Sequence, residues 1–75
     1  MNAIITTESG SKYYLCGERI TGGSIPNGKV GKYLNSFEFQ GLQSVDWPIT
    51  GACMFIKTQD GRTLKTSPVQ HIEIL

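Results

Sequence analysis

Apolar and β-branched residues occur in this 75-residue chain as short runs separated by glycine and proline, and no segment has the convincing spacing of an amphipathic helix. Short runs of this kind are typical of β-strands, whose side chains alternate between the two faces of a sheet. The clearest runs cover residues 3–7, 12–16, 52–58 and 69–75. The pattern predicts a β-rich fold.

Turn-forming residues connect these runs. The Glu-Ser-Gly-Ser cluster at 8–11 joins the first two runs and predicts an N-terminal hairpin. Asp60-Gly61 readily takes the positive φ angles of a tight hairpin turn, after which the chain returns through residues 63–66. Pro68 is expected to break that returning strand. In the final run, the alternation directs Ile72 and Ile74 inward.

These elements predict an all-β, mostly antiparallel domain covering residues 1–75, built as a small barrel or rolled sheet of five to six short strands with little or no helix. Pairing of the first and last strands would close the barrel. Closure would also remove the unpaired edges that promote aggregation.

Two regions are harder to assign. Residues 17–31 contain five glycines and predict a long loop, which is the first place to look for a binding site. Residues 32–39 place Tyr33, Phe37 and Phe39 on one face of a strand, although Tyr33-Leu34 is also compatible with a helical turn. Pro48 confines its own segment to a sheet edge or a loop.

The small core needs extra stabilisation, since a chain of this size buries only ~60% of its unfolded surface. Cys16 and Cys53 are too few for a secreted disulfide scaffold, so we interpret both as reduced core residues, alongside Phe37, Phe39 and Phe55. The two cysteines and the single His71 lack metal-ligand spacing, and no cofactor is expected. Self-association is the remaining way to stabilise so small a core, so we predict a homo-oligomer.

The expected cellular location and the net charge of the chain limit the classes of partner that it can bind. The first eight residues lack the basic region of a signal peptide, and no run approaches the ~18 apolar residues of a membrane span, so we expect a cytoplasmic protein. The formal net charge of +1 disfavours bulk nucleic-acid binding, which usually needs a strong basic excess, but leaves room for a local basic patch.

Motifs of catalysis are weak or absent. Residues 23–29 match the first positions of a phosphate-binding loop, but Val30 replaces the hydroxyl residue that would hold magnesium. His71 has no identifiable nucleophile beside it, and the carboxylates are dispersed. We therefore expect a binding protein rather than an enzyme.

Exposed aromatic and cationic residues are the binding candidates. Tyr13 and Tyr14 must face opposite sides of their strand, so one of them is offered to solvent or to a partner. A planar aromatic beside a few convergent cations suits a small nucleotide. The predicted ligand-binding residues are Lys29 and Arg62 for phosphate, Trp47 or Tyr33 for base stacking, and Arg19 as a further cation.

Two terminal segments resemble paired segments in small proteins of bacteriophages. The first is Thr7-Glu8-Ser9-Gly10-Ser11-Lys12-Tyr13 with Leu15, and the second is Lys65-Thr66-Ser67-Pro68-Val69 with Ile72 beyond it. The phage segments have the forms T-x-S-G-S-x-Y-x-L and R-T-S-P-V. The resemblance is confined to these two segments near the ends of the chain. It identifies no binding residue.

The resemblance implies an anti-defence protein in the host cytoplasm that sequesters a small nucleotide immune signal, such as a cyclic nucleotide or an ADP-ribose derivative, without catalysis. Two alternatives remain open. One is a protein-interaction module that inhibits a host immune protein or serves in phage assembly. The other is a small barrel that binds nucleic acid, for which a steep salt dependence would be the indication.

Overall fold

The computed structural model describes residues 2–26, 28–34 and 47–75, and the regular structure within them is entirely β. All neighbouring strands are antiparallel, which confirms the predicted fold class. The described strands are β1 (Asn2–Thr7), β2 (Lys12–Cys16), β3 (Arg19–Gly22), β4 (Gly31–Leu34), β5 (Cys53–Lys57) and β6 (Thr63–Ile74).

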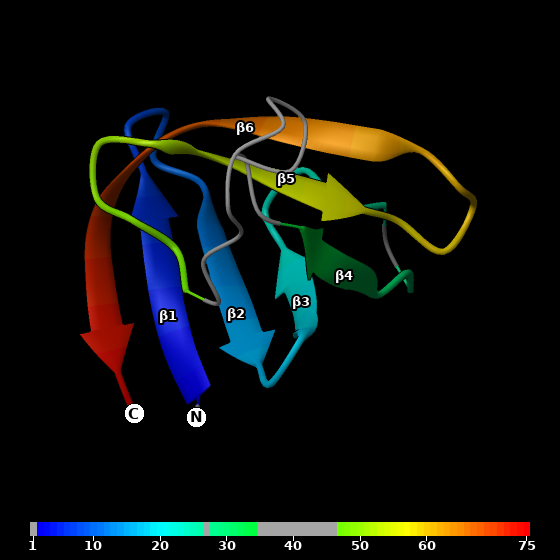
Figure 1. Ribbon diagram of the computed structural model, residues 1–75, viewed down its shortest axis with the longest axis horizontal. Coiled ribbons are helices and arrows are strands. Elements are labelled where there is room, and N and C mark those ends of the chain that lie inside the picture. Colours follow the sequence, from blue (N-terminus) through cyan, green and yellow to red (C-terminus); the bar gives the residue numbers. More distant parts are fainter. Residues whose placement is uncertain (1, 27, 35–46) are drawn as a thin grey trace.

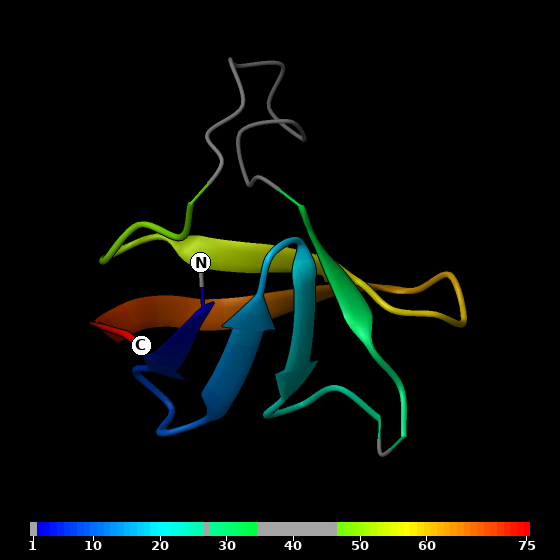
Figure 2. The same ribbon diagram turned by 90° about the horizontal axis from the view of Figure 1, so that it is seen from below.

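The strands close into a barrel, because β1 pairs with β6 as well as with β2. Ala3 lies opposite Ile74, and Ile5 lies opposite Ile72. The two ends of the chain therefore lie side by side (Figure 1). Strand β5 and the first half of β6 run across the direction of β1, β2 and β3 (Figure 2). Closure separates an inner face, which holds the core, from an outer face.

The N-terminal hairpin of β1 and β2 forms as predicted, with Thr6 opposite Lys12. Tyr13 is 1% exposed and lies in the core, whereas its neighbour Tyr14 is 51% exposed. The alternation of the strand thus sends one tyrosine to each face, and Tyr14 is the one offered to solvent.

The prediction of a single loop over residues 17–31 is wrong, because this stretch contains β3 and the start of β4. Cys16 pairs with Arg19 across a tight turn in which Gly17 has a φ of 63°. Glycine takes this φ without steric cost, so the residue that suggested a loop makes a hairpin instead. Strand β3 has only four residues, and its one large apolar residue, Ile20, is fully buried. A strand this short shows no alternating pattern.

The prediction that Pro68 breaks the chain into two strands is also wrong, because β6 runs without interruption through twelve residues. Pro68 lies opposite Cys53, beside an irregularity in the pairing of β5 with β6, and the next residue, Val69, pairs with Thr7 of β1. The proline carbonyl still accepts a hydrogen bond of 2.9 Å from the N–H of Glu8. Proline is tolerated here because β6 changes partner at this point and the ladder is already irregular.

The core is apolar and lies inside the barrel, and it includes the predicted central strand β5 through Met54 and Ile56. Three core expectations are wrong. Cys16 and Cys53 are free thiols, but they are exposed and half-buried respectively, because each lies on the outer face of its strand. Phe55 is half-buried with Lys65 over its ring. Ile74 follows the inner alternation yet is 60% exposed at the end of β6.

The middle of the chain is described only in part. Tyr33 and Leu34 belong to strand β4, which excludes the helical turn at that position. The rest of the expected strand, with Phe37 and Phe39, lies outside the described residues. Pro48 is buried and precedes an isolated bridge from Thr50 to Val69, in agreement with the expected loop.

Glycine is required at position 31 because there is no room for a larger side chain, and not because of the backbone conformation. It is buried on the inner face opposite Ile20, and a Cβ added to it would overlap the Ile56 side chain. The two isoleucines therefore fill the volume that any other residue at position 31 would need.

We predict that Gly31→Ala lowers the free energy of unfolding by about 1–3 kcal/mol, because a methyl group is forced into a filled core. Urea denaturation measures the change. In an Ile56→Ala background, which removes the overlapping group, the same substitution should cost markedly less. An equal cost in both backgrounds would show that the contact is not the cause.

Hydroxyl groups join two segments near the ends of the chain, residues 7–13 and 65–69. Ser67 Oγ donates to Ser9 Oγ at 3.0 Å and accepts from the Ser9 N–H at 3.2 Å. Ser9 Oγ in turn donates to Ser11 Oγ at 3.3 Å and lies 3.1 Å from Thr7 Oγ1. The network holds the β1–β2 turn against the middle of β6, so both segments share a structural role.

We predict that Ser9→Ala and Ser67→Ala each destabilise the fold by about 0.5–1.5 kcal/mol, the net value of an ordinary hydrogen bond. Because the two side chains are partners, their effects should be less than additive in the double variant. Thermal or urea unfolding of the four proteins measures the coupling. Fully additive losses would mean that the serines act separately.

Candidate functional site

Three cations lie side by side on the outer face of neighbouring strands. Arg19 of β3 pairs directly with Lys32 of β4, and Lys32 pairs directly with Lys57 of β5. All three side chains are exposed. We call this set, Arg19, Lys32 and Lys57, the cation row. Directly opposed residues on antiparallel strands have Cβ atoms about 4.5–5.5 Å apart, so the row is a continuous band of positive charge.

The cation row lacks a strong internal counter-charge. Like charges directly opposite one another destabilise a sheet, by up to about 1 kcal/mol per pair at this spacing in water. Glu18 offers a partial balance, with its carboxylate 4.0 Å from Lys32 Nζ, but both side chains are largely exposed. An exposed ion pair contributes roughly 0–1 kcal/mol. An anion bound across the row would relieve the repulsion.

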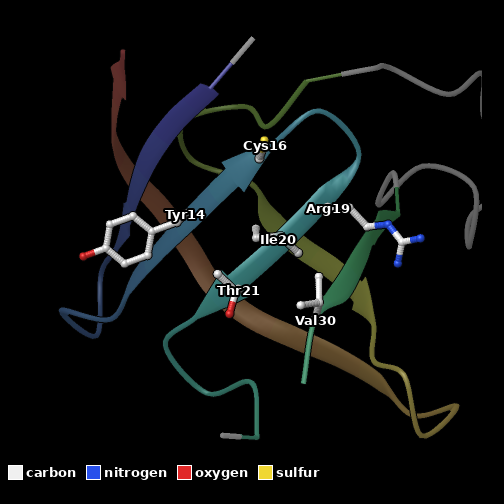
Figure 3. A pocket seen from close by; sticks show the side chains of 6 residues that line it. All are labelled: Tyr14, Cys16, Arg19, Ile20, Thr21 and Val30. Atoms are coloured by element: carbon white, nitrogen blue, oxygen red, sulfur yellow. The ribbon is translucent and has the colours of Figure 1, made fainter. Parts of the chain in front are cut away.

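A depression lies at the Arg19 end of the cation row, on the outer surface of β2 and β3 (Figure 3). Its volume is about 250 Å³. In this view Tyr14 and Arg19 lie on either side of Ile20, and Val30 lies below (Figure 3). The Tyr14 ring and the Arg19 guanidinium group point outward in opposite directions from the depression, so the lining itself is almost entirely apolar (Figure 3). The lining residues are Tyr14, Cys16, Arg19, Ile20, Thr21 and Val30.

A second charged group lies in the turn between β5 and β6. The Asp60 carboxylate accepts hydrogen bonds from the Thr58 hydroxyl and from the Arg62 N–H, and it lies 3.6 Å from Arg62 Nε. The Thr58 hydrogen bond is the largest influence and holds the pKa of Asp60 below its ordinary value. Desolvation opposes it, and weaker contributions from Arg62 and Lys29 add to the lowering. Gly61, with a φ of 87°, completes the predicted turn.

The five predicted site residues fall into three places. Arg19 belongs to the cation row and to the depression. Lys29 lies in the β3–β4 connection, and both it and Arg62 lower the pKa of Asp60. The Asp60 carboxylate in turn partly neutralises the charge of Arg62. Tyr33 and Trp47 are half-buried and pack against the core. Tyr14 therefore offers more aromatic surface than either of these two rings.

The sequence prediction did not single out Lys32, Lys57 or Tyr14 as binding residues. Lys32 and Lys57 are far apart in the chain, and only the pairing register of β4 with β5 makes them neighbours. Tyr14 was one of two candidates for exposure, and the burial of Tyr13 selects it. The detectable signal was the alternation in the strands, which assigns faces but no cross-strand partners.

Other kinds of site find little support in the described part of the chain. No group of three or more His, Cys, Asp or Glu side chains there is arranged to hold a metal ion. His71 is exposed on β6, opposite Thr6. No helix with the length and hydropathy needed to cross a membrane occurs among the residues described.

Comparison with models of protein families, with curated proteins and with solved structures returned no match. A function for the barrel therefore has to be inferred from the chemistry of its surface.

We predict that the charge of Asp60 stabilises the fold near neutral pH. Its folded-state pKa is depressed, so the stabilisation is present above the unfolded-state pKa and is lost as the pH falls through the folded-state pKa. The free energy of unfolding of the wild type should exceed that of Asp60→Asn at about pH 7, and the difference should vanish near about pH 2. A difference that does not change with pH would contradict this assignment.

Proposed function

We propose that the protein is a non-catalytic binding protein that captures a phosphorylated nucleotide on the outer face of β2, β3, β4 and β5. The observation that carries the proposal is the cation row, in which Arg19, Lys32 and Lys57 lie in direct register. Phosphate oxygens would bind these side chains and offset their mutual repulsion. Arginine adds a planar fork of donors that matches phosphate geometry.

Tyr14 supports a nucleotide rather than a simple phosphate as the ligand. The residue is half exposed, it is one of the lining residues of the same depression as Arg19, and its ring projects into solvent. A base stacked on an exposed aromatic ring gains about 1–3 kcal/mol, whatever the identity of the base. The proposed roles are base stacking for Tyr14, primary phosphate binding for Arg19 and secondary phosphate binding for Lys32. Lys29 and Arg62 lie beyond the row and would assist through their longer-range field.

The biological setting follows from the resemblance to phage proteins, together with the absence of an obvious catalytic group in the sequence. In that setting the protein is an anti-defence protein in the host cytoplasm, which sequesters a nucleotide immune signal stoichiometrically. The predicted homo-oligomer belongs to the same proposal. Exposed apolar residues available for self-association are Ile49, Ile74 and Leu75. Ile74 ends β6, and Leu75 follows it beside the N-terminal end of the chain.

The same apolar residues favour the second candidate function, a protein-interaction module that binds a host protein. Ile74 and Leu75 are 60% and 70% exposed, and the Leu75 N–H is held by the carbonyl of Asn2 at 2.9 Å. An ordered apolar end of this kind suits a protein interface. It lies on β1 and β6, away from the cation row, so substitutions separate the two functions.

We predict that Arg19→Gln weakens nucleotide binding by about tenfold or more, because a charge-assisted hydrogen bond to phosphate is lost. Tyr14→Ala should weaken it by at least about fivefold through lost stacking. Isothermal titration calorimetry with cyclic dinucleotides, ADP-ribose and ATP measures both effects. Lys12→Gln is the matched control, since Lys12 lies four residues along β2 from Cys16, the partner of Arg19, at a distance of ~13 Å.

Two results would contradict the proposed function. One is the absence of binding heat with every nucleotide in the panel at tens-of-micromolar protein. The other is binding that Arg19→Gln and Lys12→Gln weaken equally, which would indicate an effect of net charge rather than of a site. Binding of a host protein that is lost in Ile74→Ser but retained in Arg19→Gln would favour the interaction module.

A further inference from the structure

We propose that the ligand of this face is a short single-stranded oligonucleotide, whose backbone crosses the strands along the cation row. This inference rests on the proposed function and names its ligand class. It depends on three features of the described surface: the linear arrangement of the cations, their position on a convex face, and the uneven distribution of charge around the barrel.

The cations form a line rather than a cluster. Arg19, Lys32 and Lys57 occupy successive strands at one level of the sheet, and Cys16 of β2 continues the same level on the side of the depression. Strands are about 4.8 Å apart, so the level from β2 to β5 extends over roughly 14 Å. This length accommodates only a few nucleotides of a single strand, since each nucleotide of an extended strand spans more than the rise of about 3.4 Å in duplex DNA.

The row lies on the outside of a closed barrel, where neighbouring strands curve away from one another. Side chains that project from a convex surface diverge toward their tips. Divergent cations suit an extended polyanion, whose phosphates are spaced along a chain, better than the compact phosphates of one mononucleotide. Tyr14, at the β2 end, would stack one base of such a strand.

The charges of the described residues are unevenly distributed around the barrel. Six of the seven cations lie on β3, β4, β5, the first half of β6, or the β3–β4 and β5–β6 connections. The seventh, Lys12, starts β2. Among the acidic residues in the described part of the chain, Glu8 and Glu73 lie on the opposite side, in the β1–β2 turn and near the end of β6. Glu18 and Asp60 are the acidic residues described near the cations.

The length of the row also selects between single and double strands. A site with about three phosphate contacts gains too little electrostatic energy to hold a duplex. The bases of a duplex are also stacked on one another, so none of them is free to stack on Tyr14. For a single strand, each contacted phosphate contributes about −0.7 to the slope of log affinity against log salt concentration. Three contacts therefore give a slope of about −2.

Fluorescence anisotropy with labelled oligothymidylates, from the mononucleotide to the octanucleotide, tests the inference. Affinity should rise by at least about tenfold up to the trimer or tetramer and then level off, since the row is then fully occupied. Lys57→Gln should reduce the salt slope from about −2 to about −1.4 and shorten the length at which affinity levels off. Lys12→Gln should change neither quantity.

The outcomes separate this inference from the proposed function. Mononucleotide binding that depends on Arg19, with no gain on lengthening the strand, overturns the oligonucleotide ligand and leaves the proposed function intact. Failure of every mononucleotide and oligonucleotide to bind overturns both. Equal affinity for a duplex of the same length, or an unchanged salt slope in Lys57→Gln, overturns the single-stranded path along the row.

Discussion

The pairing of β1 with β6 organises the whole surface of this protein. It joins the two ends of the chain, closes the sheet and leaves no unpaired strand edge among the described strands. Once the sheet is closed, successive residues of each strand face alternately the inside and the outside of the barrel. Ile5, Ile20 and Ile56 fill the interior, and their neighbours are turned outward. The cation row is a direct consequence, because it consists of outward residues at one level of three consecutive strands.

Much of the fold was predictable from local chemistry. Short β-branched and apolar runs identified β1, β2 and β5, and the Asp60-Gly61 pair identified the β5–β6 turn. The errors arose at glycine and proline residues, which can either end a strand or lie within a continuous sheet. Gly17 makes a hairpin that begins a short strand, and Pro68 lies where one long strand changes its partner. Both residues indicate a break when they are considered without their tertiary surroundings.

The binding surface was less predictable than the fold, for a physical reason. Sequence alternation tells which residues share a face, but the register between strands decides which of them are neighbours. Arg19 was singled out by its chemistry alone, whereas its partners Lys32 and Lys57 required the register of β3, β4 and β5. Tyr14 needed the burial of Tyr13. The overall charge was uninformative, because it does not show that six of the seven cations gather on one side of the barrel.

The most direct test of this account is a map of amide chemical shifts in ¹⁵N-labelled protein during titration with trithymidylate. The account requires the largest shifts along one band of the outer surface, at Tyr14, Arg19, Lys32 and Lys57, with little change at Lys12 or Glu73. Shifts centred instead on the ends of β1 and β6, or spread evenly around the barrel, would contradict a ligand site built on paired cations of neighbouring strands.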